Sequence, residues 1–218
     1  ANTVLGFVTY KIFKTQDIIQ GLPKVEEILE ARGSSNPAIL AEKAGIVRKI
    51  LTHERSRTSQ IEVLSRLENS RKFGKLSYVL EDIENETIEI ENYQFINLTE
   101  KFHKGLTNPQ QVLDIYFDYF KQRDSHHKAV LRSLYRIASM FVKSIQGVYE
   151  SQGIKIIDRH LEVIVRQMIL KAKIEYPGST SLVYGEYVDV HQLFILNNML
   201  KTKEKKLVYY KPTLLGLT

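Results

Sequence analysis

The sequence predicts an α+β fold that is mixed and irregular: a short helix, a β-rich middle and a helical C-terminal half. Of the 218 residues, 43% are hydrophobic and 26% are charged, a balance typical of globular proteins and not of disordered ones. Apolar and polar residues alternate in several stretches between 59 and 96, which is typical of strands. From residue 108 onward the apolar residues recur every three or four positions, which is typical of amphipathic helices.

A strand followed by a short helix is predicted for the N-terminal part. Residues 4–13 are rich in β-branched and aromatic side chains, which favour a strand. In the segment 15–32, Pro23 suits the first position of a helix, because its missing N–H would have no partner there in any case. Gly33 suits the end of this helix. Three apolar residues share one face of it: Val25, Ile28 and Leu29.

Strands are predicted for most of residues 38–106. Alternation with a period of two residues occurs in three stretches: 59–66, 75–82 and 86–96. Residues 38–51 also fit a helical period, but we interpret them with their neighbours as β-structure. Basic residues gather in 54–75 and acidic residues in 81–91. For this charge pattern we favour a solvated β-meander over a working polyelectrolyte surface.

Two long helices are predicted next. Asn108 and Pro109 are well suited to the N-cap and first position of a helix over 108–122. The longest helical pattern in the chain runs over 126–153, and Gly153 ends it.

Shorter elements are predicted for the C-terminal part. Asp158 is expected to cap a third helix over 159–173. A strand is predicted over 183–190 and a helix over 191–200. The basic stretch 201–206 (KTKEKK) is expected to form a surface loop.

Composition excludes several classes of protein. The absence of cysteine excludes a disulfide framework, a thiolate nucleophile and a cysteine-ligated zinc site. No apolar stretch reaches ~18 residues, so no spanning helix is expected, and the N-terminus lacks the layout of a signal peptide. The net charge of +6 suits an anionic partner. Because the sequence starts at Ala1 and stops in an apolar segment, we expect a piece of a longer chain.

Catalytic signatures are absent from the sequence. It contains no nucleotide-binding glycine loop, no HExxH, no GxSxG and no cluster of aspartates that would hold Mg²⁺. His126 and His127 are adjacent on a helix and point about 100° apart, so we interpret them as solvated residues at a helix start. For His160 a packing or backbone contact is favoured over a catalytic role. Basic residues on the third predicted helix could contact phosphate or form an ordinary polar face: Arg159, Arg166, Lys171 and Lys173.

Four collinear segments carry a more specific pattern. They are DIIQGLPKVEEILEAR (17–32), NPAILAEKAGIV (36–47), VYESQGIKIIDRHLEVIVRQM (148–168) and LVYYKPTLLGLT (207–218). Together these segments resemble the largest catalytic subunits of bacterial-type RNA polymerases. Residues 108–153 resemble the split form of cyanobacteria and plastids, in which the beta-prime subunit is two polypeptides and the C-terminal one is beta-double-prime.

The resemblance implies a division of the chain into five parts. These are the tail of an insertion (1–14), the C-terminal arm and base of the trigger loop (15–37), a β-rich, barrel-sandwich-like module (38–107), a helical clamp or cleft-side module (108–206) and the start of the switch segment (207–218). The chain would then act within a nucleotidyltransferase, a DNA-directed RNA polymerase, without catalytic residues of its own.

Site residues also follow from the resemblance. The base of the trigger loop would be a hinge made of four residues: Gln20, Gly21, Leu22 and Pro23. Nucleic-acid contacts are expected from Arg32, Arg159, His160, Arg166 and Lys171. The chain is expected to bind no metal or cofactor, because another subunit would hold the Mg²⁺.

Partners implied by the resemblance are the beta, beta-prime and alpha subunits, a sigma factor, the DNA template and the RNA transcript, with no membrane. The expected location is the plastid (chloroplast), with the cyanobacterial cytoplasm as the alternative. A different hypothesis is a basic, non-catalytic scaffold that binds nucleic acid. A secreted or metabolic enzyme is disfavoured, because the motifs that it would need are missing.

Overall fold

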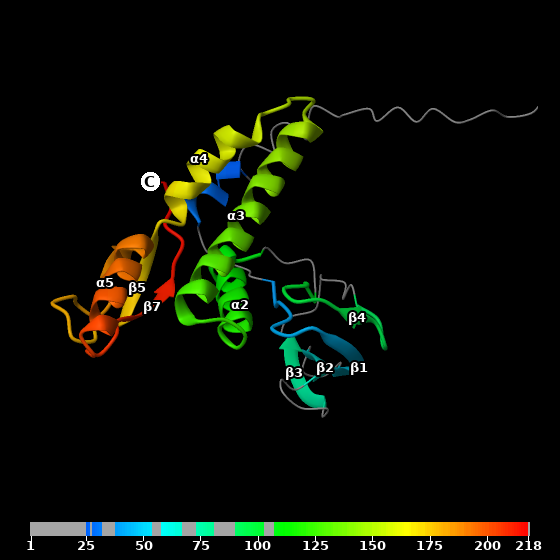
Figure 1. Ribbon diagram of the computed structural model, residues 1–218. Helices are drawn as coiled ribbons and strands as arrows, with labels where there is room; N and C mark the ends of the chain where they lie inside the picture. Colours follow the sequence, from blue (N-terminus) through cyan, green and yellow to red (C-terminus); the bar gives the residue numbers. More distant parts are fainter. Residues whose placement is uncertain are drawn as a thin grey trace, which may run out of the picture.

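The computed structural model describes residues 25–53 except 27 and 32–37, and residues 58–66, 73–80, 90–102 and 107–217. Figure 1 shows the long helix α3 in the middle, with α4 along one end of it and α2 beside the other. A four-stranded sheet lies beyond α2, and a three-stranded sheet with α5 lies on the opposite side. Helices and antiparallel sheets in one chain confirm the predicted α+β class.

The first sheet is antiparallel and has the order β3-β2-β1-β4. Its strands are β1 (Gly45–His53), β2 (Thr58–Arg66), β3 (Phe73–Leu80) and β4 (Phe95–Ile96). On β2, Ile61 and Val63 are fully buried while their neighbours Gln60, Glu62 and Leu64 are partly exposed, which is the expected alternation. Strands are therefore confirmed for 59–66 and for the described part of 75–82. Within the described part of 86–96 the prediction is wrong except for Phe95–Ile96, because residues 90–94 form no strand. Residues 38–51 contain no helix, although their apolar residues also fit a helical period. The barrel-sandwich-like form of this module stays a prediction.

Helices α2 (Pro109–Lys121) and α3 (His126–Ser151) confirm the predicted pair. The Asn108 side chain accepts a hydrogen bond from the Gln110 backbone N–H at 3.0 Å, so the predicted N-cap is present. Gly153 has φ of +75°, a left-handed conformation that favours glycine just after a helix.

Helix α4 (Asp158–Met168) is shorter than predicted, and two details of the prediction are wrong. Ile157 occupies the N-cap position, with no side-chain hydrogen bond, and Asp158 is the first helical residue. The helix also ends before residues 171–173, which begin strand β5 (Lys171–Tyr176). In β5, Ala172 and Ile174 are fully buried and their neighbours are exposed, so a period of two prevails over the helical period once a partner strand is available.

Strand β5 is the centre of the second sheet, between β6 (Tyr187–Asp189) and β7 (Tyr209–Pro212). The strand predicted over 183–190 is confirmed only for β6. Helix α5 (Val190–Thr202) confirms the predicted helix, and the Asp189 carboxylate caps it by accepting from two backbone N–H groups of its first turn. The loop predicted over 201–206 is confirmed for 203–206, which are exposed, but residues 201 and 202 belong to the last turn of α5.

The main core lies between α2, α3, α4 and the second sheet. Its largest fully buried side chains include Phe117, Phe141, Met168, Ile174 and Tyr210. Val25 reaches this core from a short helical turn, defined by the described residues 25, 26 and 28–31 and called the turn 25–31 below, which confirms the described part of the first predicted helix. The strand predicted over 4–13 lies outside the described residues.

The adjacent histidines at the start of α3 are packed and not solvated as predicted. The ring of His126 lies 4.4 Å from that of Tyr209, 4.7 Å from that of Tyr210 and 5.8 Å from that of Phe117, centroid to centroid. His127 Nδ1 is hydrogen-bonded to the Tyr210 hydroxyl at 2.8 Å. The prediction failed because β7, which covers these rings, comes from more than 80 residues further along the chain.

Burial changes the ionisation of this cluster. It lowers the pKa of His126 to about 4, and the Tyr210 backbone opposes that shift only in part. Neither ring nitrogen of His126 makes a hydrogen bond with a described residue, so the charged form gains little to offset the loss of its hydration. Burial also lowers the pKa of His127 and raises that of Tyr210 to about 12. The cluster is therefore neutral at pH 7.

The His126 site predicts a pH dependence of stability. The unfolded chain, with an ordinary histidine pKa of 6.5, binds more protons than the folded chain between pH 6.5 and about 4. The free energy of unfolding therefore falls as the pH falls through this window. We expect His126→Phe to reduce the difference between urea unfolding at pH 7 and pH 5 by about 1 kcal/mol, a value discounted for partial solvent screening. Part of the pH dependence should remain in this variant, because burial also lowers the pKa of His127. As a control, His160→Phe at an exposed position should leave the difference in unfolding free energy between pH 7 and pH 5 unchanged. The same difference in His126→Phe as in the parent protein would contradict the argument.

Candidate functional site

The predicted site residues are only partly within the described chain. The hinge residues 20–23 and Arg32 lie outside it. Arg159 and His160 lie in the first turn of α4, Arg166 lies in its last turn, and Lys171 begins β5 instead of extending the helix. All four side chains are exposed. The structure does not gather them into one site, but it brings Arg166 together with two arginines of α3 that the sequence analysis did not select.

The C-terminal segment, residues 208–217, is held by several elements. Its side chains alternate, so that Val208, Tyr210, Pro212 and Leu214 are buried. On one side, β7 pairs with β5 in an antiparallel ladder. On its other side there is no strand among the described residues, and α2 takes that place.

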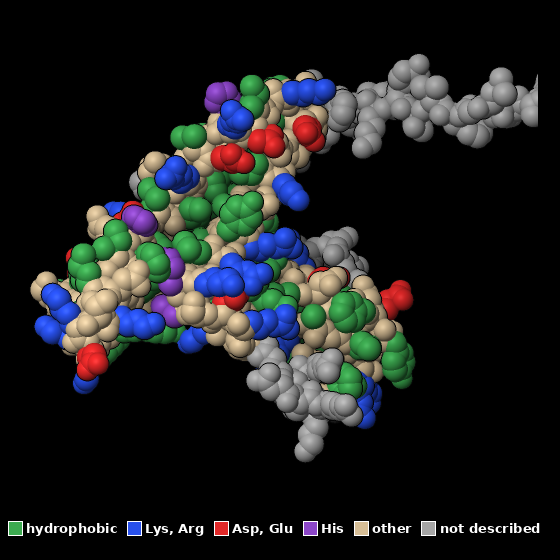
Figure 2. Space-filling model, viewed as in Figure 1, with side chains coloured by type: hydrophobic (Ala, Val, Ile, Leu, Met, Phe, Trp, Pro, Cys, Tyr) green, Lys and Arg blue, Asp and Glu red, His purple; other side chains and the backbone are tan. Residues whose placement is uncertain are grey.

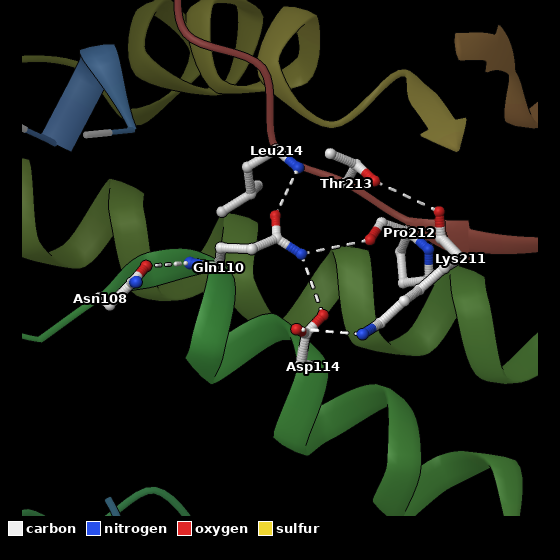
Figure 3. A network of polar contacts seen from close by, with 7 residues as sticks. All are labelled: Asn108, Gln110, Asp114, Lys211, Pro212, Thr213 and Leu214. Carbon is white, nitrogen blue, oxygen red and sulfur yellow. Dashed lines mark hydrogen bonds and ion pairs between the residues drawn. The ribbon is translucent and has the colours of Figure 1, made fainter. Parts of the chain in front are cut away.

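Gln110, in the first turn of α2, supplies the missing backbone partners (Figure 3). Its Oε1 accepts a hydrogen bond from the Leu214 backbone N–H at 3.0 Å, and its Nε2 donates to the Pro212 carbonyl oxygen at 3.5 Å. The same Nε2 donates to the Asp114 carboxylate at 2.9 Å. Asp114 in turn pairs with Lys211 of β7, with 3.1 Å between Nζ and Oδ2. One amide side chain thus hydrogen-bonds the strand as a neighbouring strand would.

Beyond this network the segment reaches the N-terminal turn of the described chain. The Leu215 backbone N–H donates to the Met168 carbonyl oxygen at 3.0 Å, at the end of α4. The Leu217 N–H donates to the Leu29 carbonyl oxygen at 3.2 Å. Between them, Gly216 lies so close to the turn that an added Cβ would meet the Glu30 carbonyl oxygen at 2.5 Å. The two ends of the described chain therefore meet through backbone contacts that only glycine permits.

A groove of about 700 Å³ lies between α3, the end of α4 and the start of α5. Its floor is aliphatic, with Leu134, Leu170 and Val190. Its rim carries three arginines, Arg132, Arg136 and Arg166, and two histidines, His127 and His191. Figure 2 shows Lys and Arg side chains gathered over the α2–α3 region, with hydrophobic and His side chains beside them toward α5.

Aromatic rings and one acid hold the arginines of α3. Arg132 lies 4.8 Å above the Phe120 ring and Arg136 lies 5.7 Å from the Tyr116 ring. Arg132 also donates to Asp124 at 2.6 Å, and this hydrogen bond lowers the pKa of the Asp124 carboxyl. The i, i+4 spacing of Arg132 and Arg136 was visible in the sequence, but their proximity to Arg166 depends on how α4 packs.

Within the described ranges, no group of three or more His, Cys, Asp or Glu side chains is placed to hold a metal ion. The geometry is that of a binding surface and an anchored strand.

The Gln110 network gives a direct test of the anchor. Gln110→Leu leaves the Leu214 N–H and the Pro212 carbonyl oxygen without their partner, so we expect a loss of about 1–3 kcal/mol in the free energy of unfolding. Hydrogen exchange at the Leu214 amide should also become faster. The matched control is Gln167→Leu, at an exposed position on α4, which should stay within about 0.5 kcal/mol of the parent. Unchanged exchange at Leu214 would show that the amide does not anchor the strand.

Comparison with known proteins agrees with the resemblance seen in the sequence. Residues 8–202 match the family RNA polymerase Rpb1, domain 5. The chain is 38% identical over 214 residues to the DNA-directed RNA polymerase subunit beta″ of Cyanidium caldarium, and 34% identical over 214 residues to that of Rhodomonas salina. It is 33% identical over 214 residues to subunit beta′ of Prochlorococcus marinus (strain MIT 9211).

Each of these alignments covers 98% of this chain but 15% or 16% of the relative, so the chain spans about one sixth of the length of the curated relatives that it matches. The predicted relationship is confirmed, and the chain belongs to the RNA polymerase Rpb1, domain 5 family.

Proposed function

We propose that the chain is part of the beta-double-prime subunit of a DNA-directed RNA polymerase and takes part in DNA-templated transcription. Its role there is to support the trigger loop and the downstream DNA channel. The names of the relatives support the general role, since they are beta″ and beta′ subunits of that enzyme. The chain supplies positioning surfaces, and the Mg²⁺ of the reaction is held by another subunit.

The contact between the two ends of the described chain carries the finer proposal. The turn 25–31 begins two positions after Pro23, the last of the residues 20–23 that the resemblance assigns to the trigger-loop base. The segment 208–217 belongs to the part that the resemblance assigns to the switch. Because Leu217 and Gly216 contact the backbone of Leu29 and Glu30, the turn rests on a strand that is itself fixed by α2 and β5. A loop that closes over a substrate needs such a fixed base.

Partners and location follow the same proposal. The beta, beta-prime and alpha subunits, a sigma factor, the DNA template and the RNA transcript are the proposed partners, in a plastid or in the cytoplasm of a cyanobacterium. None of the helices in the described ranges has the length and apolarity to span a membrane. Arg32, Arg159, His160, Arg166 and Lys171 stay predictions as nucleic-acid contacts. The alternative, a basic scaffold without a part in catalysis, is separated from this proposal by the experiment below.

Gly216→Ala tests the proposed support. The new Cβ would meet the Glu30 carbonyl oxygen, which is backbone and cannot move aside as a flexible side chain would, so the turn and the strand must separate. We expect the full-length subunit to assemble into polymerase but to add single nucleotides several-fold to about tenfold more slowly, because the loop base is displaced. The measurement is the single-nucleotide addition rate in the reconstituted enzyme.

The control is Gly147→Ala, on the exposed side of α3, where an added Cβ meets nothing within 4 Å. This variant should keep the parent rate. If Gly216→Ala also keeps that rate while DNA binding weakens, the scaffold alternative is correct. If the subunit never enters an active polymerase, the general proposal is wrong as well.

A further inference from the structure

We propose that the groove between α3, α4 and the start of α5 binds an acidic, amphipathic peptide segment of another protein. Apolar side chains of that segment would occupy the floor, and its carboxylates would pair with Arg132, Arg136 and Arg166. The inference goes beyond the proposed function, because it follows from the shape, apolarity and charge of the groove alone.

The size and floor of the groove suit peptide side chains. A volume of about 700 Å³ lies within the range of ligand-binding clefts and holds several side chains. Leu131 and Tyr135, one helical turn apart on α3, line the groove and are 47% and 78% exposed. Phe194 of α5, stacked on His127 at the edge of the groove, is 38% exposed. Large apolar side chains gathered in this way mark an interaction surface.

The charge of the groove selects an acidic ligand. Among the described residues, Arg136 and Arg166 form no ion pair, so both guanidinium groups can bind an incoming anion. Arg132 is only partly neutralised, because the Asp124 that it contacts also pairs with Lys128 at 3.2 Å. The acid on the groove itself, Asp189, already accepts two backbone N–H bonds of α5. Guanidinium groups pair with carboxylates through two parallel hydrogen bonds, which also fixes the direction of the bound chain.

A peptide fits this groove better than a nucleic acid does. A nucleic-acid strand is bound by cations along its phosphates and by aromatic rings under its bases. Here the floor between the cations is aliphatic, and two of the three described Phe and Tyr rings at the groove are already covered, Phe120 by Arg132 and Phe194 by His127. Tyr135 is the ring that stays exposed for a base. Apolar anchors in a groove with charges at its rim are instead typical of a bound amphipathic segment. Binding of RNA in place of peptide is therefore an outcome that the test must separate.

The test uses the purified full-length protein and fluorescence anisotropy. The probe is a fluorescein-labelled 14-residue peptide with leucines at helical spacing and glutamates at the other positions. A second peptide carries Gln for every Glu, and a labelled single-stranded 8-nucleotide RNA is the third probe. We expect the acidic peptide to bind the parent protein and the uncharged peptide to bind at least tenfold more weakly. Because the comparison of the acidic with the uncharged peptide changes the peptide and not the protein, it does not depend on how a variant folds.

Protein variants locate the binding. The double variant Arg136→Gln with Arg166→Gln should weaken the acidic peptide at least tenfold, and Leu131→Ser should weaken both peptides. The matched control is Lys143→Gln, an exposed cation on the same helix outside the groove, which should leave the affinity unchanged. Equal affinity of the double variant and the parent for the acidic peptide would overturn the proposal. So would RNA binding that the double variant abolishes, or the absence of peptide binding by the parent protein.

Discussion

One amide side chain determines where the last described strand of this chain lies. Strand β7 has β5 on one side and a helix on the other, so its backbone would leave polar groups without partners. Gln110 provides them, because a glutamine amide carries both a donor and an acceptor, as a peptide group does. Its Nε2 donates a hydrogen bond to the Pro212 carbonyl oxygen, and its Oε1 accepts one from the Leu214 N–H. A strand can therefore pack directly against the start of a helix.

Three features depend on the strand placed in this way. Tyr210 is fully buried and its hydroxyl positions His127, which lines the groove. The rings of Tyr209 and Tyr210 enclose His126 and keep it neutral. The end of the segment meets the turn 25–31 through Gly216. The groove, the histidine cluster and the support under the turn therefore share one structural element.

What could be predicted from the sequence was local. The N-cap at Asn108, the end of α3 at Gly153 and the alternation in β2 are encoded within a few residues, and each was predicted correctly. The errors came from distant partners. Residues 171–173 fitted a continuing helix, and they form a strand because they pair with β6 and β7, which lie up to 40 residues further along the chain. The groove was missed for the same reason: Arg132 and Arg136 are neighbours in sequence, but Arg166 joins them only through the packing of α4 on α3.

The position of the groove relative to the anchored strand is set by helix α2. Gln110 in its first turn bonds the C-terminal segment, while Tyr116 and Phe120, toward its other end, hold the arginines at the groove rim. Ten residues separate Gln110 from Phe120, so these contacts lie about 15 Å apart along a helix that rises 1.5 Å per residue. Each contact is made to a side chain of the same rigid element, and no described loop intervenes between them. A partner bound in the groove would therefore be held at a fixed distance and direction from the turn 25–31, through packed side chains and without a flexible linker.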